Sequence, residues 1–215
     1  VARKLAHEIK NPLTPIQLSI DRLKEKFASQ IKDSDDFKNY LDTINRQIKD
    51  IENLANEFSN FARMPNPKFE KITINSIINR AIDFVKMSSK NLIIFENLNK
   101  NLYVNADEKQ LYRVFINLIK NSEESFLEKK LKTPDFKGKI HIEILLINDY
   151  IVVKIADNGL GIVDIKKVMT PYFTTKKTGT GLGLPIVEKI INEHSGELSI
   201  SNIKSGGIEV KIFFP

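Results

Sequence analysis

The sequence contains no cysteine, which excludes disulfides, thiolate metal sites and cysteine nucleophiles. It also lacks a signal peptide and any apolar run near the roughly 18 residues that a membrane-spanning helix needs. Low-complexity tracts and internal repeats are absent too. Of its 215 residues 41% are hydrophobic and 28% charged, a globular balance that argues against a disordered or fibrous chain. The net charge of +6 is compatible with phosphate-bearing partners but too diffuse to indicate nucleic acid.

Apolar residues at steps of three and four recur through the first 62 residues. One stripe comprises Leu5, Ile9, Leu13, Ile16, Ile20, Leu23 and Phe27, and a second comprises Phe37, Leu41, Ile44, Ile48, Ile51, Ala55, Phe58 and Ala62. Such stripes predict two amphipathic helices whose apolar seams face other helices. A two-helix hairpin cannot bury both seams alone, so we expect it to pair with a second copy as a four-helix bundle. The sequence therefore predicts a homodimer.

Two prolines, Pro65 and Pro67, end the second helix and mark a domain boundary. We predict a hairpin domain over residues 1–64, a linker over 65–71 and a second domain over 72–215. In the second domain we expect helices over 75–86, 107–130 and 183–194, and strands over 92–98, 102–105, 139–147, 150–156, 197–202 and 207–214. Mixed helices and mostly antiparallel strands make the fold class α+β, with a two-layer α/β sandwich after the hairpin.

The first candidate site is His7, with Glu8 beside it and Asn11 one helical turn away. His7 lies next to the apolar stripe, so its ring can reach solvent. A neutral imidazole is a good nucleophile toward phosphorus, and a neighbouring carboxylate can take its proton as the bond forms. Asn11 could orient a water against a phosphoryl group on His7. An ordinary surface histidine with a chance acidic neighbour is the alternative.

The second candidate site is a pair of asparagines, Asn117 and Asn121, which share a helical face. Amide oxygens can ligate Mg²⁺ without adding negative charge beside a triphosphate. Lys120, or a basic group near it, could meet phosphate oxygens. Two ordinary amides on a helix surface are the alternative.

The third candidate site is Asp157, which follows a predicted strand, with Gly159 and Gly161 after it. An acidic side chain at a strand end can accept a hydrogen bond from an exocyclic amine such as that of adenine. The two glycines let the backbone turn and approach a flat ligand. A plain strand-to-helix turn explains these residues equally well.

The fourth candidate site is a run of alternating glycines, Gly179, Gly181 and Gly183, that opens a predicted helix. Backbone N–H groups at a helix N-terminus attract phosphates, and such glycines can also form a mobile lid over a nucleotide. The pattern is neither a Rossmann fingerprint nor a P-loop. A structural glycine loop is the alternative.

These four sites occur in one order, and with them the chain resembles the catalytic core of bacterial sensor histidine kinases over essentially all 215 residues. The resemblance comprises a dimerisation and histidine-phosphotransfer hairpin followed by a GHKL-type ATP-binding domain. The stretches His-Glu-Ile-Lys-Asn-Pro-Leu-Thr-Pro-Ile-Gln-Leu-Ser and Phe-Ala-Arg-Met-Pro-x-Pro further resemble the nitrogen-regulation NtrY-like subgroup.

The resemblance implies ATP-dependent autophosphorylation on His7, with Glu8 as general base and Asn11 positioning a water that dephosphorylates the regulator. The implied ATP-site residues are Asn117, Lys120, Asn121, Asp157, Gly159, Gly161, Phe173, Gly179, Thr180, Gly181, Leu182 and Gly183. Among them Asn121, supported by Asn117, would hold Mg²⁺, and Asp157 would accept a hydrogen bond from the adenine base. Ser122 departs from the family pattern, because many relatives carry alanine there.

The implied partner is the receiver domain of a response regulator, with the NtrC type as the candidate, whose aspartate receives the phosphoryl group. We expect no nucleic-acid partner. Because the chain starts inside a predicted helix, we expect a longer protein that is anchored in the inner membrane through an upstream region, with this part in the cytoplasm.

Two alternatives remain open. One is a GHKL-type ATPase that couples hydrolysis to conformational change without phosphohistidine, and the other is a non-enzymatic dimeric scaffold with a degenerate pocket. A third outcome within the kinase resemblance is that the natural output is mostly phosphatase, because Asn11 is present. Outside the four sites, His141 and His194 are expected to be structural. Lys129, Lys130 and Lys132 are expected to form a solvated basic surface.

Overall fold

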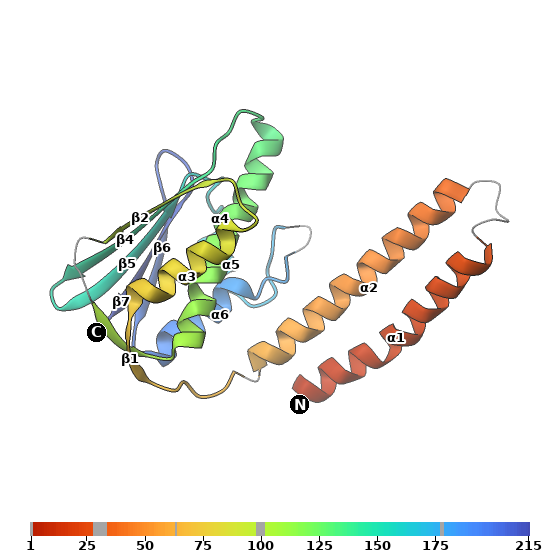
Figure 1. The fold of residues 1–215 in the computed structure, drawn as a ribbon, viewed down its shortest axis with the longest axis horizontal. Helices are drawn as coiled ribbons and strands as arrows, with labels where there is room; N and C mark the ends of the chain where they lie inside the picture. The colour runs from red at the N-terminus through yellow and green to blue at the C-terminus, as the bar shows by residue number, and fades with distance from the viewer. Residues whose placement is uncertain (1, 28–33, 63, 98–101, 177–178) are drawn as a thin grey trace. The chain divides into compact units, whose positions relative to one another are not determined.

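The computed structural model describes residues 2–27, 34–62, 64–97, 102–176 and 179–215. The chain divides into two compact units. The first comprises Val1–Pro65 and Thr175–Leu182, and the second comprises Asn66–Thr174 and Gly183–Pro215. Figure 1 shows a helical hairpin in the first unit and a mixed α/β arrangement in the second.

The hairpin consists of helices α1 (Ala2–Phe27) and α2 (Ser34–Ala62), which run antiparallel (Figure 1). Its core is formed by Leu13, Ile20, Leu41 and Ile48, and each is at most 6% exposed. A hydrogen bond of 3.0 Å from Gln17 Nε2 to Asn45 Oδ1 links the two helices beside this core. The predicted pair of amphipathic helices is confirmed.

The structure divides each predicted apolar stripe into two halves. In α1, Leu13 and Ile20 pack inside the hairpin, whereas Ile16 and Leu23 are 45% and 44% exposed. In α2 the corresponding exposed residues are Ile44 and Ile51, at 43% and 42%. Each helix therefore keeps a second row of apolar side chains, spaced seven residues apart, that one copy of the hairpin leaves in contact with solvent.

The second unit is built on a five-stranded sheet in the order β2–β4–β5–β7–β6. Its strands are β2 (Leu92–Asn97), β4 (Lys139–Ile147), β5 (Tyr150–Asp157), β6 (Glu197–Asn202) and β7 (Ile208–Phe214). Only β2 and β4 pair in parallel, so the expectation of a mostly antiparallel sheet is confirmed.

Three helices, α3 (Ile74–Lys86), α4 (Glu108–Lys132) and α6 (Gly183–Glu193), lie on one side of this sheet (Figure 1). Alternate strand residues such as Ile140, Ile142 and Ile144 are fully buried. This alternation is the pattern of a sheet with one covered face. The predicted two-layer α/β sandwich is therefore confirmed.

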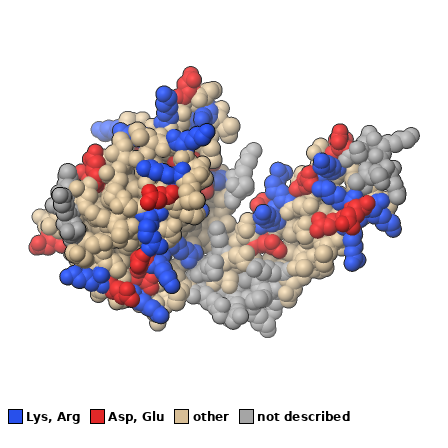
Figure 2. All heavy atoms as spheres, in the orientation of Figure 1, with Lys and Arg blue, Asp and Glu red and all other residues tan. Residues whose placement is uncertain are grey.

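The opposite face of the sheet carries ion pairs rather than a second layer. Lys154 Nζ lies 3.1 Å from Glu209 Oε2 and 4.0 Å from Glu143 Oε2. Figure 2 shows basic and acidic side chains interspersed over the visible surface. In the part of the chain that the structure describes, no helix combines the length and apolar character needed to cross a bilayer.

The sequence-based prediction missed two short elements of the second unit. Strand β1 (Glu70–Thr73) pairs antiparallel with β3 (Tyr103–Ala106), and α5 (Ile165–Val168) is a single helical turn. Each missed element is four residues long, so neither shows a full hydrophobic period. Strand β1 leads from the linker into α3, and β3 leads into α4.

Candidate nucleotide-binding site

Asp157 forms the centre of the candidate site. It is the last residue of β5, and the residue is only 6% exposed. Its Oδ1 accepts hydrogen bonds from the backbone N–H groups of Gly159 at 2.9 Å and Ile208 at 3.3 Å. Its Oδ2 accepts a hydrogen bond of 2.8 Å from the hydroxyl of Ser122. A carboxylate at the end of a buried strand is thus held by three donors from three segments.

Glycines allow the backbone to close around this carboxylate. A Cβ on Gly207 would lie 1.9 Å from the carbonyl oxygen of Asp157, and a Cβ on Gly159 would lie 2.3 Å from Ser125 Oγ. Gly161 and Gly207 also have positive φ angles of 81° and 87°, which side chains rarely adopt. The loop after β5 and the turn before β7 are therefore specific to glycine.

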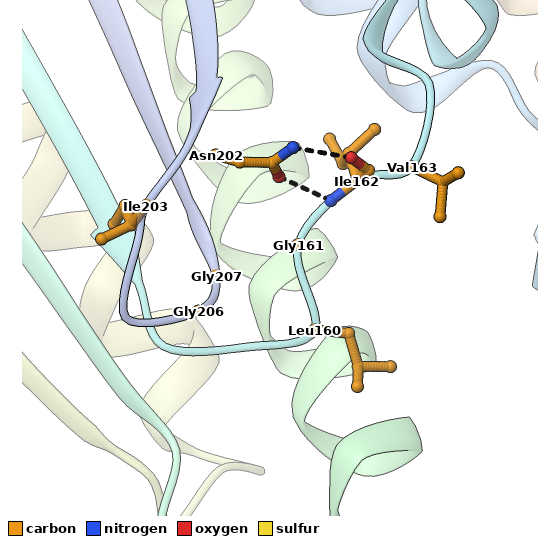
Figure 3. A pocket seen from close by; sticks show the side chains of 8 residues that line it. All are labelled: Leu160, Gly161, Ile162, Val163, Asn202, Ile203, Gly206 and Gly207. Carbon is orange, nitrogen blue, oxygen red and sulfur yellow. Dashed lines mark hydrogen bonds between the residues drawn. The ribbon is translucent and has the colours of Figure 1, made fainter.

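The same loop borders a shallow hollow of about 170 Å³ (Figure 3). Its lining residues are Leu160, Gly161, Ile162, Val163, Asn202, Ile203, Gly206 and Gly207. The amide of Asn202 fixes one wall, because it accepts from Ile162 N at 2.8 Å and donates to Ile162 O at 2.7 Å (Figure 3). These two hydrogen bonds to the backbone of Ile162 hold the loop against the end of β6.

The two predicted asparagines lie on α4, one turn apart and before Ser122. The amide of Asn121 faces the start of α6, since a Cβ on Gly183 would lie 3.7 Å from both of its terminal atoms. The Nδ2 atom of Asn117 is buried and has no hydrogen-bond partner among the described residues. The structure thus brings Asn121 close to the helix that the glycine run opens.

These amides fit a magnesium ion that is shared with a polyphosphate. Among the described residues no cluster of three or more His, Asp or Glu side chains could hold a metal ion alone. Mg²⁺ is commonly bound by one or two protein oxygens and completes its shell with phosphate oxygens and water. The spare polar atom of Asn117 fits this use, because rotation of an amide exchanges its oxygen and nitrogen.

The glycine run behaves as predicted at its end. Helix α6 begins at Gly183, and Gly181 has a φ of 70°. Leu182 is fully buried, while Gly179 and Thr180 are half-buried. Residues 177 and 178 lie outside the described part of the chain. Gly179 to Leu182 belong to the first unit, and Gly183 to the second.

Phe173 and Lys120 make other contacts within the second unit. Phe173 is half-buried, and its backbone N–H donates to Thr170 O at 3.2 Å in the turn after α5. The ammonium group of Lys120 lies 5.5 Å from the ring centroid of Phe84 on α3. Lys120 therefore faces α3, whereas Asn121 faces α6.

The predicted phosphoacceptor residues lie on α1. His7 and Glu8 are helical, but their side chains lie outside the described part of the structure. Asn11 is exposed on the same helix. Two prolines, Pro12 and Pro15, follow directly within α1.

One site residue was assigned wrongly from the sequence. Lys129 was expected on a solvated surface, but its Nζ donates to the carbonyl oxygens of Asn158 at 2.5 Å and Gly159 at 2.8 Å. Ser125, three residues after Ser122, also holds this loop by accepting from Leu160 N at 2.9 Å. Spacings of three and four put these residues on one helical face, which is the signal that the sequence offered.

His194 is structural, as predicted. It is 5% exposed, its Nε2 accepts from the backbone N–H of Asp107 at 2.9 Å, and its Nδ1 lies 2.8 Å from Ile190 O. His141 is part-exposed and pairs with Glu96 at 3.2 Å.

Two family models match the chain. The model of the histidine kinase-, DNA gyrase B- and HSP90-like ATPases matches residues 106–215, and the model of the His Kinase A (phospho-acceptor) domain matches residues 1–67. Together they cover the hairpin and most of the second unit, in the order that the four motifs predicted.

Curated relatives and solved structures agree with these models. An NtrY-like sensor histidine kinase of Rickettsia felis is 40% identical over the whole chain, and the nitrogen regulation protein NtrY of Azorhizobium caulinodans is 36% identical over 96% of it. The chain spans only 35% and 27% of these proteins. The histidine kinase ThkA, solved in complex with the response regulator protein TrrA, is similar over 99% of this chain and 60% of that one, with a TM-score of 0.70 and 26% identity.

Proposed function

The chain belongs to the histidine kinase-, DNA gyrase B- and HSP90-like ATPase family and forms a sensor histidine kinase core, and on this premise we propose that it transfers the γ-phosphoryl group of ATP to His7. The observation that carries the proposal is the buried Asp157 at the strand end of an ATPase-family domain, in one chain with a phospho-acceptor hairpin. We assign the phosphotransfer hairpin to residues 1–64, the linker to 65–71, whose last two residues, Glu70 and Lys71, already belong to β1, and the ATP-binding domain to 72–215.

Asp157 would bind the base of ATP. An ionised carboxylate only accepts hydrogen bonds, so it selects a base that presents an N–H donor, such as the 6-amino group of adenine. Gly159 and Gly161 keep the loop free of side chains beside the base. The lid would be formed by Gly179, Thr180, Gly181, Leu182 and Gly183, with Phe173 at its start.

Asn121, supported by Asn117, would hold Mg²⁺ against the phosphates. The ion supplies charge neutralisation between phosphate oxygens, and amide ligands add no negative charge of their own. Lys120, or a basic group near it, would meet phosphate oxygens, although in this structure its ammonium group lies 5.5 Å from the ring centroid of Phe84. Catalysis would then rest mainly on positioning the reacting groups.

At His7 an imidazole nitrogen would attack the γ-phosphorus. A nitrogen–phosphorus bond forms, the bond to the β,γ-bridging oxygen breaks and ADP leaves. Glu8 would accept the imidazole proton as the bond forms. The phosphoryl group would then pass to an aspartate of a response regulator, and Asn11 would orient the water that later removes it.

The receiver domain of a response regulator is the partner that we propose, because the similar kinase ThkA was solved with a response regulator protein. The names of the NtrY relatives make an NtrC-type regulator the first candidate. The hairpin would form a homodimer through the exposed rows of Ile16, Leu23, Ile44 and Ile51.

The first experiment incubates the protein with γ-labelled ATP and Mg²⁺, comparing the native chain with His7→Gln. We expect label that survives alkali, is lost in acid and is absent from the variant. His141→Gln is the matched control, because among the described residues His141 pairs with Glu96 on a neighbouring strand, and it should be labelled like the native chain.

ATP hydrolysis without labelling of the native chain would contradict the kinase assignment and favour the GHKL-type ATPase alternative. Label that remains in His7→Gln would show that another residue is the acceptor.

A further inference from the structure

The hydroxyl of Ser122 makes a contact that the proposed function does not yet use. Ser122 is 2% exposed and lies on α4, 35 residues before Asp157 in the sequence. Its Oγ is 2.8 Å from Asp157 Oδ2 but 3.4 Å from Leu118 O, the usual acceptor one turn back on its own helix. The shorter bond also goes to a charged acceptor, so the hydroxyl proton points at Asp157.

This contact changes what Asp157 can still accept. A carboxylate offers about four acceptor positions. The backbone N–H groups of Gly159 and Ile208 use Oδ1, and Ser122 uses one position on Oδ2. One position on Oδ2 remains for a ligand. With all other positions satisfied by fixed groups, the carboxylate cannot turn without breaking a hydrogen bond.

We propose that Ser122 is a positioning residue for nucleotide selection: its hydroxyl holds the Asp157 carboxylate so that a single acceptor position meets the exocyclic amino group of the base. The inference rests on the proposed function of Asp157 in adenine binding. Without the hydroxyl, Oδ2 has two open positions, and the carboxylate rotates or binds water that the amino group must displace. The loss of the hydroxyl should therefore lower the affinity only of ligands that carry this amino group.

The experiment compares the binding of two nucleotides by calorimetry. One is ATP, and the other is purine riboside triphosphate, which lacks only the 6-amino group. In Ser122→Ala we expect ATP affinity to fall about tenfold, the lower range for a hydrogen bond to a charged group. Affinity for the analogue should change less than about twofold, because the analogue gives Asp157 no donor.

Ser122→Cys is a second variant, since a thiol fills nearly the same buried space but is a weak donor. Ser122→Cys should lose the preference for ATP as Ser122→Ala does. The proposal can therefore be tested even if one of the two variants does not fold. Ser125→Ala is the matched control. Ser125 holds the same loop through Leu160 N without touching the carboxylate, so both nucleotides should weaken equally.

Each outcome decides the proposal. A preference for ATP that shrinks in both Ser122 variants but not in Ser125→Ala supports it. An unchanged preference, or a parallel loss of both nucleotides, overturns the positioning role while leaving Asp157 as the base-binding residue. A native chain that shows no preference for ATP over the analogue would instead overturn the proposed role of Asp157 itself, and with it this inference.

Discussion

At the scale of single residues, Gly207 tests how tightly the loop around Asp157 is closed. Gly207→Ala would place a Cβ 1.9 Å from a backbone oxygen at a φ of 87°, so the backbone itself must shift. We expect a loss of unfolding free energy well above the roughly 2 kcal/mol that a left-handed side chain costs alone. Urea denaturation of the native and variant chains measures this loss.

The adjacent Gly206 gives the matched control. Its φ is 103°, but the nearest atom to a Cβ there is Lys129 Nζ at 3.4 Å, the end of a flexible side chain. Gly206→Ala should therefore cost only about 1–2 kcal/mol, the backbone term. Equal losses in the two variants would show that the contact with Asp157 is not what requires glycine at 207.

Asp107 makes the stability of the second unit depend on pH. Partial burial acts to raise its pKa, but hydrogen bonds from the backbone N–H groups of Lys68, Gln110 and Lys109, with the adjacent His194, outweigh it and hold the pKa below its ordinary value. A lowered pKa in the folded state means that ionised Asp107 stabilises the fold above the ordinary pKa of 3.8. That contribution is lost as the pH falls through the folded-state pKa.

The difference in unfolding free energy between the native chain and Asp107→Asn should therefore be constant near neutral pH and shrink below pH 3.8. Asparagine is a suitable N-cap, so helix α4 should still form. Urea midpoints at a series of pH values measure this difference. Asp83→Asn, on the exposed side of α3, is the control. If the difference in unfolding free energy between the native chain and Asp107→Asn does not change with pH, Asp107 does not have this role.

At the scale of elements, α4 holds the loop after β5 through a polar row that consists of Ser122, Ser125 and Lys129. Lys129 at the end of this row donates to two carbonyl oxygens, Asn158 O and Gly159 O. Replacing it by methionine keeps an apolar stem but leaves both carbonyls without this donor. We expect Lys129→Met to lower the unfolding free energy by about 1–3 kcal/mol.

Lys130 provides a comparison on the same helix, because its side chain is exposed. Lys130→Met should change stability by less than about 0.5 kcal/mol. Hydrogen exchange at Leu160 N, which donates to Ser125, reports whether the loop opens. If the two lysine variants behave alike, the row does not hold the loop.

The three residues of this row show which part of the site could not be predicted from the sequence. Hydrophobic periodicity predicted α4 and the strands β4 and β5, because each buries a continuous apolar face. Asp157 and the asparagines were found because their residue types suggest chemistry. Ser122, Ser125 and Lys129 were not assigned to the site, because polar residues on a helix usually face water, and only the packing of β5 against α4 brings acceptors to them.

At the scale of the whole molecule, heptad spacing predicted the hairpin but could not separate its two kinds of seam. Leu13 and Ile16 belong to one stripe, yet Leu13 packs within the hairpin and Ile16 is 45% exposed. The spacing is the same for contacts inside one chain and between two copies. Which row is left over depends on how α1 and α2 pack against each other, and the spacing does not determine that packing.

The leftover row is the surface that we expect to join two copies. In Ile16→Glu each hairpin would bring a carboxylate into the seam, which costs about 3 kcal/mol or more without a partner charge. This corresponds to a roughly 100-fold or larger increase in the dissociation constant of the dimer. Sedimentation equilibrium over a range of protein concentrations measures it. Leu18 is 55% exposed and lies off the row, so Leu18→Glu should dimerise as the native chain does. If both variants stay dimeric, or both become monomers, the row of Ile16 and Leu23 is not the seam.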